Sequence, residues 1–182
     1  MGQYYQPIIF CYENGKVKIL AWLYSWSFMS GSKLTEHSYL RNSFVNAVES
    51  LLIPGGAYHN ARLVWAGDYA DGEPDDPEGR NLYHQTDEVP QHDQFLKGFV
   101  ASEYPYIVNH SKHQYVLKAA ASEQGIHPLP LLTAEGNGRG GGDYRGSEED
   151  KVGMWARDII SVEKEPPSDY IELKVSFNEA EY

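Results

Sequence analysis

Residues 7–26 read PIIFCYENGKVKILAWLYSW and carry the strongest local structural signal in the chain. Two runs within them, 7–12 and 16–26, are rich in apolar, β-branched and aromatic side chains, which is typical of strands. The pair Asn14-Gly15 lies between the runs and supplies the positive φ angles that a two-residue hairpin turn requires. The stretch therefore predicts a β-hairpin near the N-terminus.

The next segment, residues 38–52, has the spacing of an amphipathic helix. Apolar side chains recur every three or four positions from Leu40 to Leu52, so they share one helical face. Ser38 is placed to cap the start, and the run Pro-Gly-Gly at 54–56 predicts the end.

Further segments have the composition of strands and follow this helix along the chain. They are residues 61–66, 104–109, 113–118, 129–133, 155–163 and 170–177. One clear helix among about seven or eight strands predicts an α+β fold, in which helix 38–52 packs on one face of an antiparallel or mixed sheet. We expect residues 1–182 to form one domain, with long loops at 67–93 and 134–150.

The chain is acidic, with a formal net charge of −11 over 182 residues. The excess acid lies in residues 61–100 and 148–182, which disfavours broad binding to nucleic-acid backbones and suits a basic protein partner. Cys11 is the one cysteine, so it can form no internal disulfide, and a reducing compartment is the natural interpretation. No apolar run is long enough to cross a bilayer, and the N-terminus lacks signal-peptide features. We therefore expect a cytoplasmic protein that does not enter the membrane.

The strongest candidate site is a glycine-rich stretch that directly follows the predicted strand 129–133. Ordering each glycine costs about 0.5–1 kcal/mol more than ordering an alanine. If the stretch is ordered, some interaction must therefore compensate for this cost. One reason is an anion held by backbone N–H groups and arginine side chains. Others are a surface linker, or a turn that contacts only the protein. The candidate residues are Gly136, Asn137, Gly138, Arg139, Gly140, Gly141, Gly142, Asp143 and Arg145.

Two aspartates that end the predicted strand 61–66 are the next candidates. Residues 63–71 read LVWAGDYAD and place Asp68 and Asp71 directly after the strand. They are predicted to give polar specificity to a ligand site. The simpler alternative is a loop in which both carboxylates accept hydrogen bonds from backbone amides.

The histidines give weaker signals. His37 stands between Glu36 and Ser38, but adjacent residues rarely form a catalytic relay, so a role beside the helix start is the simpler interpretation. His110 and His113 flank one predicted turn without a third ligand, and we predict no metal site there.

Four pieces of the chain carry a resemblance: MGQYY at 1–5, KLTEHS at 33–38, WAGDYAD at 65–71 and LLTAEGNGRGGGD at 131–143. Together they resemble an uncharacterised family of tailed-phage and prophage-encoded proteins. The resemblance implies no activity. It implies that strands 61–66 and 155–163 are neighbours, which would bring Asp68 and the glycine-rich stretch to one edge of the sheet. It also implies the host cell cytoplasm as the location.

Three functions are compatible with these features. The one taken forward is a phage-type accessory protein that binds a small anionic, phosphate- or nucleotide-like ligand through the glycine- and arginine-rich stretch. The second is an acidic interaction or host-inhibitor module that engages a basic host or virion protein. The third is a hydrolase with Asp68 or His37 in an acid–base role. No cofactor is expected, and self-association into a homo-oligomer is left open.

Overall fold

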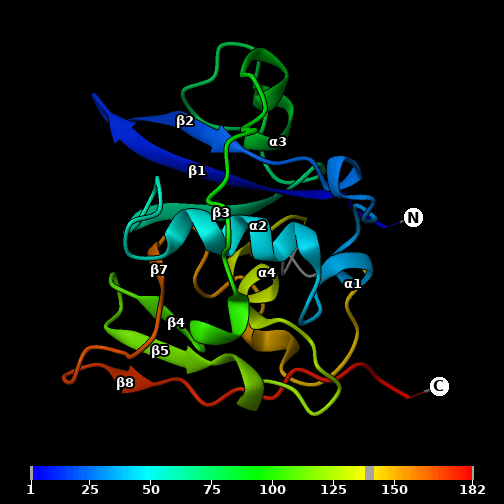
Figure 1. Ribbon diagram of the computed structural model, residues 1–182. Coiled ribbons are helices and arrows are strands. Elements are labelled where there is room, and N and C mark those ends of the chain that lie inside the picture. Colours follow the sequence, from blue (N-terminus) through cyan, green and yellow to red (C-terminus); the bar gives the residue numbers. More distant parts are fainter. Residues whose placement is uncertain (1, 138–141, 182) are drawn as a thin grey trace.

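The computed structural model describes residues 2–137 and 142–181 and has the predicted α+β architecture (Figure 1). Eight strands within the described residues form one mixed sheet in the order β2-β1-β3-β7-β4-β5-β8, with β6 paired to β3. The strands are β1 (Tyr5–Glu13), β2 (Lys16–Trp22), β3 (Ala61–Gly67), β4 (Tyr106–Asn109), β5 (Gln114–Leu117), β6 (Ala134–Glu135), β7 (Ile159–Glu163) and β8 (Ile171–Glu172).

Short helices and turns connect these strands. The α-helices are α1 (Leu34–His37), α2 (Ser43–Leu52), α3 (Leu82–Gln85) and α4 (Pro128–Thr133). The 3-10 turns are η1 (Ser25–Phe28), η2 (Thr86–Glu88), η3 (Ala101–Glu103), η4 (Lys118–Ala120) and η5 (Glu149–Lys151). In the part of the chain that the structure describes, no helix is long and apolar enough to span a bilayer.

The predicted N-terminal hairpin is present as β1 and β2. Asn14 and Gly15 have φ angles of 52° and 77°, as a tight hairpin turn requires. Strand β2 ends at Trp22 instead of continuing to Trp26, because the chain turns into η1. The Ser30 N–H closes that turn by donating to the Ser25 carbonyl at 3.1 Å.

The predicted helix 38–52 is present as α2, but its start was misplaced. Asn42, not Ser38, is the N-cap: its Oδ1 accepts hydrogen bonds from the N–H groups of Phe44 and Val45 at 2.9 and 3.1 Å. Arg41 has a φ of 71°, which interrupts helical backbone just before this cap. The apolar face of α2 is buried against the sheet, as its spacing predicted.

The prediction of a strand at 129–133 was wrong, because these residues form helix α4. Pro128 occupies the first turn, where a missing N–H costs nothing. The His127 side chain caps the helix by accepting the Leu129 N–H at 3.2 Å. The strand predicted at 155–163 begins only at Ile159, because Arg157 has a φ of 70° that breaks the extended backbone.

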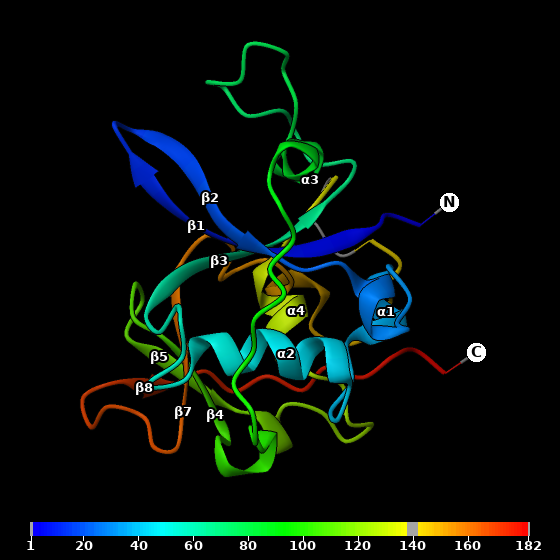
Figure 2. The same ribbon diagram turned by 45° about the horizontal axis from the view of Figure 1, so that its top comes forward.

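Both faces of the sheet are covered. Helices α2 and α4 pack on one face and contribute to the larger core. On the other face Leu82 of α3 packs against Ile8, Phe10 and Val64, and Figure 2 shows α3 beside the β1–β2 hairpin. The segment predicted as loop 67–93 therefore contains α3 and covers the second face.

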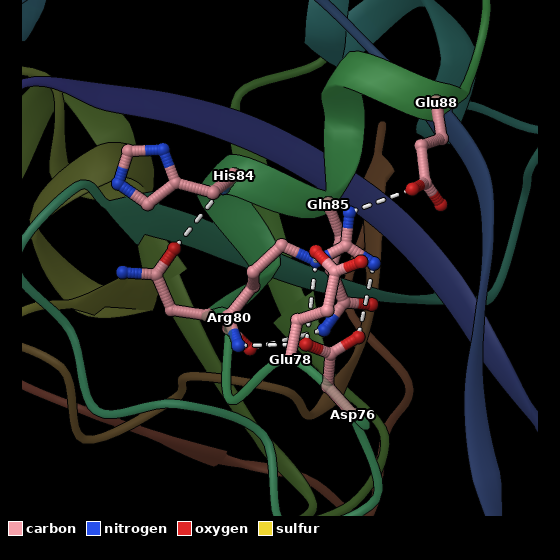
Figure 3. A network of polar contacts seen from close by, with 7 residues as sticks. Asp76, Glu78, Arg80, His84, Gln85 and Glu88 are labelled. Carbon is pink, nitrogen blue, oxygen red and sulfur yellow. Dashed lines mark hydrogen bonds and ion pairs between the residues drawn. The ribbon is translucent and has the colours of Figure 1, made fainter.

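Arg80 holds the acidic part of this segment together (Figure 3). Its guanidinium lies 3.0 Å from Asp76, 2.7 Å from Glu88 and 3.4 Å from Glu78. The hydrogen bonds that Arg80 donates hold the pKa of Asp76 below its ordinary value. Arg80 therefore balances one of these three negative charges, and the segment keeps a net negative charge.

We expect Arg80→Gln to loosen this loop without unfolding the protein. Loss of the cation leaves three carboxylates close together, and like charges repel. Amide exchange should therefore accelerate at two backbone N–H groups. One is the N–H of position 80, which is bonded to Asp76 at 2.7 Å in the wild type, and the other is that of Glu73, which donates to the carbonyl of position 80 at 2.9 Å. Lys18→Gln, in an exposed pair on β2, is the control. Unchanged protection of Glu73 in Arg80→Gln would contradict the prediction.

Candidate functional site

The structure brings Asp68 and the start of the glycine-rich stretch to one end of the sheet. Strands β3 and β7 are antiparallel neighbours, as the resemblance implied for 61–66 and 155–163. Strand β6 runs parallel to β3, with Ala66 opposite Glu135, so Asp68 and Gly136 leave the sheet at the same end.

The described glycines of this stretch lie against the protein's own side chains. A Cβ atom on Gly136 would fall 2.3 Å from Gln3 Oε1, and one on Gly142 would fall 2.7 Å from Tyr5 Cε2. The Asn137 N–H already donates to Gln3 Oε1 at 3.0 Å. Close packing explains these positions, which favours the alternative of a turn that contacts protein. The other candidates, Gly138, Arg139, Gly140 and Gly141, lie outside the described residues.

The charged candidates also bond to the protein. Asp143 accepts hydrogen bonds from the backbone N–H and the hydroxyl of Thr35. The Arg145 guanidinium donates to the carbonyls of Gly142 and Tyr144, at 3.0 and 2.7 Å. Asp68 accepts the Tyr4 N–H at 2.9 Å, and Asp71 is exposed. These side chains gather at one end of the sheet around Tyr5. Burial and the carboxylates of Asp143 and Asp68 raise the pKa of the Tyr5 hydroxyl, and the Arg145 guanidinium opposes this.

His37 is fully buried with both ring nitrogens engaged. Its Nδ1–H donates to the Gly31 carbonyl, and its Nε2 accepts the Trp65 indole N–H, each at 2.9 Å. Burial lowers the pKa of His37 to about 4, although the Gly31 carbonyl and the nearby Asp143 oppose this. Neither nitrogen is free for a substrate, so the geometry supports a structural role for this histidine.

The other histidine pair is likewise engaged by neighbouring residues. His110 bonds to the Tyr170 hydroxyl at 3.0 Å and to Ser161 Oγ at 2.7 Å, while His113 stacks on the Tyr170 ring. Across residues 2–137 and 142–181, no three His, Cys, Asp or Glu side chains are grouped to hold a metal ion.

A buried charged cluster, which the sequence analysis did not identify, lies elsewhere in the fold. Glu49 on α2, Lys118 on η4 and His127 before α4 are 0%, 6% and 1% exposed. The Lys118 ammonium donates to Glu49 Oε2 at 2.7 Å and to the Ala101 carbonyl at 3.1 Å. His127 Nε2 bonds to the other carboxylate oxygen. Buried charge of this kind is rare unless it is paired.

The protonation pattern of this cluster follows from its hydrogen bonds. The Leu129 N–H can only donate, so His127 Nδ1 accepts and the proton lies on Nε2, facing Glu49. Burial raises the pKa of the Glu49 carboxyl, but the hydrogen bond from the His127 Nε2–H, the Lys118 charge and the Lys118 hydrogen bond lower it, and the net pKa lies below the ordinary value. The cluster therefore contains a carboxylate, an ammonium and a neutral imidazole.

The cluster forms the inner wall of a pocket of about 690 Å³ between α2, η3 and η4. In Figure 1 the segment 89–100 runs down past α2 toward this region. The polar residues that line the pocket are Arg41, Asn46, Glu49, Ser102, Lys118 and His127. Apolar pockets of this size with a few convergent polar groups are typical ligand sites.

One signal in the sequence pointed to this site. Glu49 lies one position after Val48 and four after Val45, on the apolar face of α2. A carboxylate at such a position must find a buried partner. Its partners, Lys118 and His127, lie 69 and 78 positions away in the chain, so no local sequence pattern predicts them.

No family of known proteins, no curated protein and no solved structure matches this chain. The resemblance to a phage-encoded family therefore stays a prediction. Function has to be inferred from the geometry and chemistry of the sites.

Proposed function

We propose that the protein binds a small anionic molecule in the pocket beside α2. One observation carries this proposal: in a chain with a net charge of −11, the polar groups that line this pocket carry an excess of positive charge. The charge of Lys118 is balanced by Glu49, and Arg41 adds a second cation. Within the described residues, no hydrogen bond or ion pair engages the Arg41 guanidinium.

Hydrogen-bond donors are available in the pocket. The Lys118 ammonium has three N–H donors and uses two, for Glu49 and the Ala101 carbonyl. The Asn46 carboxamide lines the same pocket and bonds to no other side chain in the described part of the chain. An anion placed there would gain charge-assisted hydrogen bonds, which are stronger than neutral ones.

The proposal is tested by ligand screening combined with a matched set of variants. Thermal shift and calorimetry against inorganic phosphate, AMP and short carboxylic acids should identify a ligand that raises Tm. Arg41→Gln should weaken that ligand about threefold to fivefold, because Arg41 is exposed and an exposed charge pair contributes at most about 1 kcal/mol. Lys16→Gln, an equal charge change on β2, should leave affinity unchanged.

Two outcomes would overturn the proposal. One is a panel in which no anion binds. The other is an anion whose affinity is unaffected by Arg41→Gln but is lost in Arg145→Gln. That second result would place the ligand at the glycine-rich stretch instead, as the sequence alone suggested.

A further inference from the structure

The charge balance of the pocket sets the charge of the ligand that it can hold. Glu49 and Lys118 neutralise each other, and His127 is neutral because its Nδ1 accepts a backbone N–H. Arg41 is then the one uncompensated charge among the lining residues that the structure describes. A ligand with a single negative charge brings this balance to zero.

A dianion fits the same balance poorly. A phosphate monoester carries close to two negative charges at neutral pH, so one would remain uncompensated beside the Glu49 carboxylate. Unpaired charge in a partly desolvated site is costly. A carboxylate has one charge and two oxygens, which match the free Lys118 N–H and the Arg41 guanidinium.

The rest of the pocket favours an apolar body. Its apolar lining consists of Leu40, Phe99, Val100, Ala101, Pro105 and Ala119. The Phe99 ring stacks on Tyr104, with centroids 5.7 Å apart, and this contact fixes its position. Val100 is 46% exposed at the rim. A sugar or a nucleobase would lose hydrogen bonds to water against these walls, whereas an acyl chain or aromatic ring would gain apolar contact.

We infer that the ligand is a small monocarboxylic acid with an apolar body, its carboxylate bound by Lys118, Asn46 and Arg41 and its body lying against Phe99 and Val100. This inference rests on the proposed function of the pocket and narrows it. It disfavours nucleotides, which carry more charge and more polar surface.

The test uses four probes that share one body and differ in the head group: hexanoate, hexyl phosphate, hexanamide and hexylamine. Binding is followed by NMR at pH 7.5, through backbone shifts of residues 99–101 and 118–119. Hexanoate should bind at least tenfold more tightly than hexyl phosphate and hexanamide, and hexylamine should not bind.

The outcomes separate the inference from the proposed function. If hexyl phosphate binds more tightly than hexanoate at these residues, the inference fails and the proposed function stands. Equal affinity for hexanamide and hexanoate would show that the head group plays no part, and both would fail. The absence of shifts with every probe would remove the inference, and the proposed function would then depend on the wider panel of anions.

A charge variant gives an independent check of the carboxylate position. Asn46→Asp introduces a negative charge beside the head group with almost no change in shape, and it should weaken hexanoate at least tenfold. Asn14→Asp makes the same chemical change in the β1–β2 turn and should leave hexanoate affinity unaltered. If the two variants bind hexanoate equally well, the carboxylate does not lie at Asn46 and the inference is wrong.

Discussion

Glu49→Ala is expected to lower the free energy of unfolding by about 3–5 kcal/mol, because it leaves a buried ammonium without its counter-charge. Glu49 is 0% exposed and Lys118 6% exposed, so water cannot readily replace the lost carboxylate. The His127 Nε2–H loses its acceptor in the same step. Urea unfolding followed by circular dichroism measures the effect.

A matched control makes the contribution of burial explicit. Glu13→Ala removes the same side chain from an ion pair with Lys18, in which the two partners are 60% and 54% exposed. Exposed pairs contribute at most about 1 kcal/mol. The free energy of unfolding of this variant should therefore be close to that of the wild type. A similar loss of stability in Glu49→Ala and Glu13→Ala would contradict the claim that burial makes the Glu49–Lys118 pair important for stability.

The partner of Glu49 provides a second check. Adding Lys118→Met to Glu49→Ala removes the stranded charge while keeping an apolar side chain of similar length. Replacing both members of a buried pair is often close to neutral, so the double variant should be more stable than Glu49→Ala alone. If the second substitution recovers no stability, Lys118 is not stranded in the single variant.

The sequence correctly predicted the elements that are determined by residues within or next to the element itself. The β1–β2 hairpin follows from Asn14-Gly15 and its flanking strands, all within twenty residues. The body of α2 follows from its apolar spacing, but its start depends on Asn42 and on the positive φ of Arg41. The sequence predicted Ser38 as the cap because it precedes Leu40, whereas the helix of the folded protein begins after Asn42.

Helix α4 shows why composition failed at 129–133. A short leucine-rich run is compatible with a buried strand or a buried helix. Pro128 at the first position of a helix was the signal that favours the helix. The run is buried on all sides, so it has no polar face whose spacing would have revealed the helical period.

The candidate sites differ in the same way. A run of glycines is easy to notice in a sequence, but it does not say what lies next to the backbone. Glycine is required wherever the backbone passes close to a ligand or to another part of the protein. At Gly136 and Gly142 the close neighbours are the side chains of Gln3 and Tyr5. The charged cluster is inconspicuous in the sequence, because Lys118 and Glu49 are 69 positions apart and meet only in the folded chain. Long-range pairing of this kind is a property of the fold.

His37 should make stability strongly dependent on pH. The unfolded chain takes up a proton on this residue near pH 6.5, whereas burial lowers the folded-state pKa to about 4. Between these values the unfolded state binds more protons, so the contribution of His37 to stability is lost as the pH falls from 6.5 to 4 and is fully present above 6.5. A shift of this size corresponds to roughly 3 kcal/mol.

The contacts of His37 explain why the folded state resists protonation. Its Nε2 accepts the Trp65 indole N–H at 2.9 Å, and a proton on Nε2 would set two donors against each other. NMR of the ring nitrogens should therefore show a neutral imidazole, protonated on Nδ1, down to about pH 4. In His37→Gln the free energy of unfolding should lose this part of its pH dependence. Equal slopes for the variant and the wild type between pH 4 and 6.5 would mean that the buried imidazole does not govern acid stability.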